Sequence, residues 1–201
     1  MKRLGIALMA ITLSAVGVIA ASMAFTLMSP ALSGKPEVGS FSKLTSEGRM
    51  DPVYAAGDKD PMNTKSFPFS WKNLPKGTVA LALVFDDPDA RPVMKIYKIP
   101  GQAYLHWTAT DIDPALGALE ENASASHSFA QGKNTSGTVG YVGPRPPSDI
   151  PPKTKKPIIH IYRLMVYALS AKTGLADGYT LPELDRAMKG KVLGKAKLFF
   201  S

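Results

Sequence analysis

An apolar run that ends in carboxylates is the strongest constraint on how this chain folds. Val79-Ala-Leu-Ala-Leu-Val-Phe85 contains no polar residue, and Asp86-Asp87-Pro88-Asp89 follows it directly. Such a run, bounded by turn residues, is typical of a strand in the core of a sheet. Because alternate residues of a strand share a face, Asp87 should end the row that Leu81, Leu83 and Phe85 begin. The sequence therefore predicts a carboxylate at the rim of the core.

Most of the remaining chain is also predicted to be β-structure. Four segments are rich in β-branched and aromatic residues and are separated by Pro, Gly, Asp and Asn: Thr78 to Phe85, Lys95 to Ile99, Tyr104 to Ile112 and Ile158 to Leu169. Two short helices are expected, Pro114 to Asn122 and Leu181 to Met188, the second beginning after Thr180. The expected fold class is therefore all-β dominated, a β-sandwich with a few short peripheral helices.

Composition narrows the class of protein further. The chain has 201 residues, of which 45% are hydrophobic, enough for one domain with a sizeable core. It has no cysteine, which excludes disulfides and thiolate metal sites. A net charge of +8 fits attraction to anionic ligands, but it also fits simple solubility. The one dense basic cluster, Lys153 to Lys156, has no interleaved aromatic residues, so no nucleic-acid partner is expected.

The first residues are predicted to be a targeting segment. Lys2-Arg3 precede a charge-free apolar stretch from Leu4 to Met28, and small residues follow at Ser29-Pro30-Ala31. This pattern is typical of an export signal peptide, although residues 4–28 are also long enough to span a bilayer and anchor the chain in a membrane. We expect residues 1–31 to be the signal or anchor and 32–201 to be the domain. A periplasmic or secreted location is expected, with anchoring in the cytoplasmic membrane as the alternative.

Two of the three histidines fall within predicted strands. Strand alternation places His106 on the opposite face from Leu105 and Trp107, and it places His160 on the same face as Tyr162. His127 lies in a polar segment and is expected in a loop. A histidine in a strand is most often a structural residue, and spacing alone does not say that these side chains meet.

Several motifs in one order resemble the phosphatidylethanolamine-binding protein family, which includes the Raf kinase inhibitor protein and bacterial relatives. They are Asp87-Pro88-Asp89 with Pro92, His106-Trp107, Gly132-Lys-Asn134, Gly140-Tyr-Val-Gly-Pro-Arg-Pro-Pro147, and His160-Ile-Tyr162 with Tyr167-Ala-Leu169. The resemblance covers roughly residues 39–201. Each motif is weak alone, but their order and spacing are specific.

The resemblance implies a β-sandwich of that family's type with a small anion-binding pocket at one end. The pocket would hold phosphate, phosphorylethanolamine or a phospholipid headgroup, without a cofactor. Position by position, the family's ligand-binding residues correspond to Asp87, His106, His160 and Tyr162, with Gly143, Pro144, Arg145 and Pro146 as a wall. Imidazole N–H groups, the tyrosine hydroxyl and loop amides would donate to phosphate oxygens, and Asp87 would orient a histidine or accept from a ligand ammonium. Protonation of a histidine would tighten binding, so affinity should fall as pH rises.

The chain departs from the family pattern in three places, one of which is a segment from Ser148 to Pro157 that is longer than usual in the family. Arg91 adds one residue before Pro92, and Arg145 stands in the wall where relatives often have a smaller residue. Arg145 could contact the anion or face solvent. Asp86, on the opposite strand face, is expected in solvent, and Asp89 is expected to cap the turn at Pro88.

Two other functions remain open on the sequence. Asp87, His106 and His160 are the ligand types of a facial metal triad, which would make the chain a metal-dependent hydrolase, although their wide spacing argues against it. The proline-rich loop 144–157 could instead contact a protein partner, as in relatives that inhibit kinases or proteases. Without a nucleophile motif, the expectation is that the chain is not an enzyme.

Overall fold

The computed structural model describes residues 37–40, 49–56, 64–90, 102–145 and 159–201. The predicted strand Lys95 to Ile99, the leader 1–31, Pro92, Pro146 and the rest of the loop up to Pro157 lie outside these residues. The strands are β1 (Glu37–Ser40), β2 (Phe69–Lys72), β3 (Ala80–Asp87), β4 (Tyr104–Ile112), β5 (Ala118–Leu119), β6 (Ala130–Gln131), β7 (Tyr162–Leu169) and β8 (Val192–Phe200). The helix is α1 (Leu181–Met188), and short 3-10 turns are η1 (Pro52–Tyr54), η2 (Pro88–Ala90) and η4 (Pro114–Leu116).

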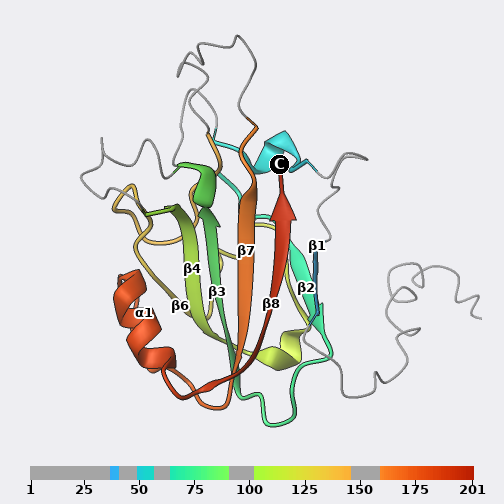
Figure 1. The fold of residues 1–201 in the computed structure, drawn as a ribbon, viewed down its shortest axis with the longest axis vertical. Coiled ribbons are helices and arrows are strands. Elements are labelled where there is room, and N and C mark those ends of the chain that lie inside the picture. Colours follow the sequence, from blue (N-terminus) through green and yellow to red (C-terminus); the bar gives the residue numbers. More distant parts are fainter. Residues whose placement is uncertain (1–36, 41–48, 57–63, 91–101, 146–158) are drawn as a thin grey trace, which may run out of the picture. The chain divides into compact units, whose positions relative to one another are not determined.

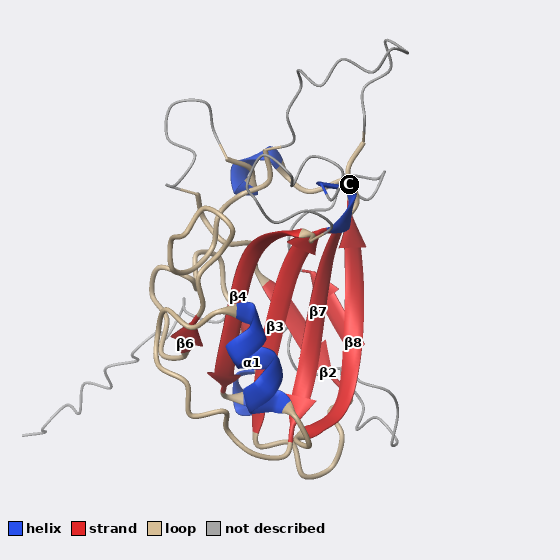
Figure 2. Cartoon of the chain, turned by 60° about the vertical axis from the view of Figure 1, so that its left-hand side comes forward, coloured by secondary structure: helices blue, strands red, loops and turns tan. Residues whose placement is uncertain are grey.

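The strands form two antiparallel sheets, which confirms the expected all-β sandwich. The larger sheet has five strands in the order β6-β4-β3-β7-β8, and the smaller has three in the order β1-β2-β5 (Figure 1). One hydrophobic cluster lies between the sheets and includes Phe69 of β2 and Leu83 and Phe85 of β3. A second cluster lies under α1 and includes Val84 and Leu184. In this article the inner face of the five-stranded sheet is the one toward β2, and the outer face is the one that α1 partly covers (Figure 2).

The position of β3 explains its apolar sequence. This strand pairs with β4 on one side and β7 on the other, and every residue from Ala80 to Asp87 is buried. Leu81, Leu83 and Phe85 face the inner cluster while Ala82 and Val84 face the outer one, as strand alternation predicts. The apolar run therefore supplies side chains to both cores, and Asp87 ends its inner row.

The helical predictions were half right. Leu181 to Met188 is a helix with the expected bounds, and Thr180 and Glu183 form a capping box at its start. The predicted helix from Pro114 to Asn122 is wrong, because the helical turn ends at Leu116 and Gly117 adopts a left-handed conformation with φ of 68°. Residues Ala118 and Leu119 then pair with β2 as strand β5. The left-handed glycine ends the helical turn and turns the chain into the sheet.

Candidate ligand-binding site

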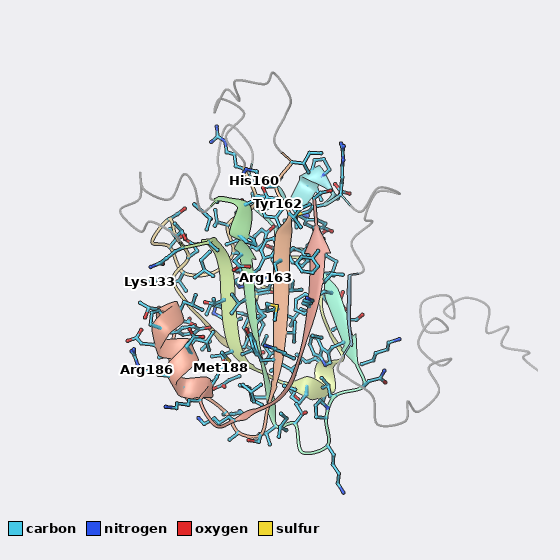
Figure 3. All side chains as sticks on the ribbon, in the orientation of Figure 1. Lys133, His160, Tyr162, Arg163, Arg186 and Met188 are labelled. Carbon is cyan, nitrogen blue, oxygen red and sulfur yellow. The ribbon has the colours of Figure 1, made fainter. Side chains whose placement is uncertain are left out.

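Four side chains that the family resemblance selected lie together near the ends of β3, β4 and β7. Asp87 is the last residue of β3, His106 lies in β4, and Tyr162 is the first residue of β7. His160 precedes β7 by two residues, and Figure 3 shows His160 and Tyr162 at the same end of that strand. All four side chains are buried, with exposed fractions between 3% and 7%.

His160 and Asp87 form a buried pair. The Nδ1 atom of His160 donates to Oδ2 of Asp87 at 2.5 Å. The other carboxylate oxygen accepts from the backbone N–H groups of Asp89 at 2.9 Å and Ala90 at 3.1 Å. Asp87 therefore fixes the ring of His160 and also caps the turn η2. The expected cap, Asp89, instead accepts from the N–H of Ile161 at 2.9 Å.

A β-bulge turns His106 toward this pair. In the β3–β4 ladder Phe85 is opposite Trp107, but Asp86 is opposite Leu105, so His106 is an extra residue on its strand. The strand-alternation prediction for His106 was therefore right relative to Leu105, which faces the outer cluster, and wrong relative to Trp107, because a bulge breaks the alternation of faces. The imidazole contacts the rings of Phe85 and Tyr162, with centroids 5.3 and 5.4 Å away. The bulge thus brings His106 to the inner face, where Tyr162 and Phe85 lie.

Burial holds His106 in its neutral form at neutral pH. Its Nδ1 atom lies 2.9 Å from the carbonyl oxygen of Val142 and must donate to it, because a carbonyl only accepts. The pKa of His106 is lowered to about 4, mainly because burial removes the ring from water; the bond to Val142 opposes this shift, and nearby His160 adds to it. The neutral ring then presents a lone pair at Nε2. The expectation that a protonated histidine attracts the anion is therefore wrong for His106.

This burial predicts a stability change with pH. The unfolded chain takes up a proton at His106 near pH 6.5, whereas the folded chain does so only near pH 4, so the stability present above about pH 6.5 is lost as pH falls toward 4. The loss should be on the order of 3 kcal/mol. Urea unfolding at several pH values should show it, and His106→Asn, which keeps a donor near Val142, should lose less stability over the same range. An equal dependence of the free energy of unfolding on pH in both proteins would contradict the assignment of this loss to His106.

The hydroxyl of Tyr162 has no hydrogen-bond partner in the described part of the chain, although it is buried. Two other buried hydroxyl groups there also lack partners, but these, on Thr108 and Tyr179, both lie beside Gly132 and close to each other. Burial raises the pKa of Tyr162, and Asp87 and Asp89 raise it further, so the phenol stays protonated. An unpaired buried hydroxyl costs on the order of 1–3 kcal/mol, so its retention needs an explanation.

Two backbone amides of the predicted wall segment are bonded within the protein. The N–H of Gly143 donates to Thr64 Oγ1 at 2.9 Å, and the N–H of Val142 donates to the carbonyl oxygen of His106 at 3.0 Å. The expectation that these loop amides bind phosphate is therefore not supported at either position. Pro144 is buried and Arg145 is exposed, while Pro146 lies outside the described residues.

Gly143 is held by a close approach of two backbones. A Cβ atom there would lie 2.5 Å from the nitrogen of Ala56 and 2.7 Å from the carbonyl oxygen of Tyr54. Gly143→Ala should therefore destabilise the fold by about 1–3 kcal/mol in thermal unfolding. Gly137→Ala is the control, because it meets no atom within 4 Å and carries only the left-handed penalty of roughly 1 kcal/mol. A smaller loss for Gly143→Ala than for Gly137→Ala would contradict this packing.

Asp86 was predicted to be in solvent, and this is wrong. It is buried and accepts two hydrogen bonds from Arg163, from Nε at 2.9 Å and from Nη2 at 2.6 Å. The partner is the residue opposite Asp86 in β7, so the pair crosses the sheet on its outer face. His127 is exposed and lies in a loop, as predicted.

The sequence motifs pointed to the main side chains but not to their partners. Val142, which fixes the tautomer of His106, lies inside the Gly140 to Pro147 motif, so a signal for it existed. Thr64, whose hydroxyl oxygen accepts from the N–H of Gly143, lies in no sequence motif that could have indicated this role. Among the described residues, no three His, Cys, Asp or Glu side chains are grouped so that they could hold a metal ion. The metal-dependent alternative has no support from this geometry.

Comparison with known proteins gives a consistent result. The profile described as phosphatidylethanolamine-binding protein matches residues 41–200. A UPF0098 protein of Methanothermobacter thermautotrophicus is 37% identical over 135 residues, which cover 65% of this chain and 78% of the relative. The putative lipoprotein LppC of Mycobacterium tuberculosis is 32% identical over 133 residues, covering 65% of this chain and 56% of LppC.

A solved structure has the same fold. The crystal structure of a putative phosphatidylethanolamine-binding protein homolog, CT736 of Chlamydia trachomatis, superposes with a TM-score of 0.65 at 27% sequence identity. The alignment covers 83% of this chain and 95% of CT736. The match therefore spans nearly the whole of the solved chain.

Proposed function

Because the chain belongs to the phosphatidylethanolamine-binding protein family, we propose that it binds a small phosphorylated ligand where Asp87, His106, His160 and Tyr162 meet. The ligand class is phosphate, phosphorylethanolamine or a phospholipid headgroup, which share a phosphoryl group. The proposal includes no catalytic role.

The unpaired hydroxyl of Tyr162 carries this proposal. It is a buried donor on a ring that contacts both histidines, with centroids 5.4 Å from His106 and 6.4 Å from His160. In the described hydrogen bonds each histidine uses only its Nδ1 atom. A ligand oxygen that accepted from Tyr162 would satisfy the hydroxyl, and charge-assisted bonds of this kind are the stronger ones.

Each remaining side chain has a distinct proposed role. Asp87 positions His160, because both of its oxygens already accept bonds within the protein. His106 offers a lone pair at Nε2 and therefore needs a hydrogen from the ligand. The ammonium group of phosphorylethanolamine supplies such a hydrogen, as does the P–OH group of singly protonated phosphate. The site is thus suited to a ligand that carries both a phosphoryl oxygen and a donor.

We also propose that the domain acts outside the cytoplasm. The basic and apolar start of the chain supports export, with residues 1–31 as signal or anchor and 32–201 as the domain, in the periplasm or secreted. The relative named as a putative lipoprotein is compatible with this location. In the portion of the chain that the structure describes, no helix could cross a membrane. The partner loop proposed at 144–157 lies mostly outside that portion.

Isothermal titration calorimetry tests the proposed ligand class. Phosphorylethanolamine should bind, and phosphorylcholine, whose quaternary nitrogen has no hydrogen to donate, should bind at least about tenfold more weakly because His106 stays unpaired. Inorganic phosphate should bind with intermediate affinity. The absence of binding of all three ligands to the folded protein would overturn the proposal. Equal affinity for phosphorylethanolamine and phosphorylcholine would overturn the role of His106.

A further inference from the structure

The outer face of β7 and β8 carries exposed apolar and cationic side chains beside the candidate site. Ile159, Ile161 and Phe199 are 58%, 40% and 47% exposed. Ile159 and Ile161 alternate along the chain with the buried residues His160 and Tyr162, so the same segment serves the site with one side and the outer face with the other. Figure 2 shows that α1 covers the part of this face over β3 and β4, away from the β8 edge.

The strand register brings these residues into one surface. Phe199 is opposite Arg163, Lys197 is opposite Met165, and Lys195 is opposite Tyr167. Because Ile161 precedes Arg163 by two residues, it is a diagonal neighbour of Phe199 on that face. Lys195, Lys197 and Phe199 are all exposed, and the ammonium of Lys197 lies 5.3 Å from the centroid of the Phe199 ring. We call this surface, formed by Ile159, Ile161, Lys195, Lys197 and Phe199, the outer patch.

The charge of the outer patch is positive. Arg163 is already neutralised by its two hydrogen bonds to Asp86, which leaves Lys195 and Lys197 as the charges that the patch offers to a partner. The chain as a whole carries +8, which favours its approach to an anionic surface. Exposed aliphatic and aromatic side chains beside lysines are the chemistry of a surface that sits at the headgroup level of a bilayer.

We propose that the outer patch docks the domain on an anionic phospholipid bilayer. Ile159, Ile161 and Phe199 enter the boundary between headgroups and acyl chains, while Lys195 and Lys197 contact lipid phosphates. Such docking places the His160 to Tyr162 segment against the membrane surface. The docked patch also gives the candidate site a source of headgroups.

A single fluorescent label tests this docking in the full chain. The natural sequence has no cysteine, so Ile159→Cys gives one labelling site. Val79→Cys is the matched control, because Val79 is 49% exposed and precedes β3 at the end opposite to Asp87. The vesicles contain phosphatidylglycerol and phosphatidylcholine in equal parts. With them, the fluorescence emission of the label at 159 should shift to shorter wavelength and be quenched by spin-labelled lipid. The emission of the label at 79 should show neither change. This local readout does not depend on whether residues 4–28 also bind the vesicle.

Charge reversal separates the patch from the rest of the surface. Lys195→Glu with Lys197→Glu should weaken the vesicle response of the label at 159 by about thirtyfold or more. Lys76→Glu with Lys172→Glu makes the same change in net charge on two exposed residues at the opposite strand ends and should have little effect. No response at 159, equal responses at 159 and 79, or equal effects of the two double variants would each overturn the proposal. A blue shift that grows with protein concentration without vesicles would also overturn it, since a second copy would then cover the patch.

The two proposals fail separately. Tyr162→Phe removes the hydroxyl proposed to bind the headgroup and leaves the outer patch intact, so the label at 159 should still respond to anionic vesicles. If the label response were lost in this variant, docking would depend on the headgroup site and the patch proposal would be wrong.

Discussion

Tyr162→Phe should weaken phosphorylethanolamine binding by at least about tenfold without destabilising the unliganded protein. The hydroxyl is buried and has no partner in the described residues, so its removal breaks no hydrogen bond within them. It also relieves a desolvation cost, and the variant should be as stable as the wild type or more stable by about 1 kcal/mol. Titration calorimetry and urea unfolding measure the two effects.

Tyr141→Phe is the matched control for this variant. Tyr141 belongs to the same hydrophobic cluster and stacks on Phe85, but its hydroxyl donates to the carbonyl oxygen of Tyr54 at 2.7 Å. Its removal should cost about 1 kcal/mol of stability and leave ligand affinity unchanged. If Tyr162→Phe lost stability as Tyr141→Phe does and kept its affinity, the hydroxyl would be structural and the proposed site would be wrong.

Asp87→Ala should be the most destabilising of the substitutions considered, by about 3–5 kcal/mol. It removes the acceptor for the N–H groups of His160, Asp89 and Ala90 at once, and all three are buried or partly buried. It should also abolish ligand binding, because nothing then holds the ring of His160. Urea unfolding gives the stability, and titration calorimetry gives the affinity.

Asp113→Ala separates the capping part of this effect from the buried pair. Asp113 precedes a proline and accepts from the N–H two residues later at 2.9 Å, as Asp87 does, but it is exposed and has no histidine partner among the described residues. It should cost only about 1 kcal/mol. Asp87→Asn should recover most of the stability, since its oxygen can still accept from the turn. Equal losses for Asp87→Ala and Asp113→Ala would contradict a special role for the buried pair.

Local sequence patterns predicted correctly the elements whose local preference agrees with their pairing in the fold. Tyr104 to Ile112 and Leu181 to Met188 formed with the expected bounds, because the first has strong β-propensity and the second has a capping box. In the segment Pro114 to Asn122, local preference and pairing in the fold disagree. A short turn after Asp113 was mistaken for a helix, and pairing with β2 took Ala118 and Leu119. Tertiary pairing outweighs weak local preference there.

The candidate site was predictable in its residue types but not in its geometry. The order of motifs selected Asp87, His106, His160 and Tyr162, yet strand alternation wrongly put His106 and Trp107 on opposite faces. The bulge that corrects this depends on how β4 pairs with β3, which no local pattern in β4 states. The neutral state of His106 likewise follows from burial against Phe85 and Tyr162, and burial is a property of the folded chain.

The most direct test of the proposed site is a ¹⁵N NMR titration of the histidine side chains. The chain has three histidines, so His127, which is exposed and pairs with Asp177, serves as an internal control. Adding phosphorylethanolamine at neutral pH should shift the Nε2 resonances of His106 and His160 and leave those of His127 in place. Unchanged Nε2 resonances of His106 and His160 at saturating ligand, or equal shifts at all three histidines, would contradict a ligand site between Tyr162 and the two buried imidazoles.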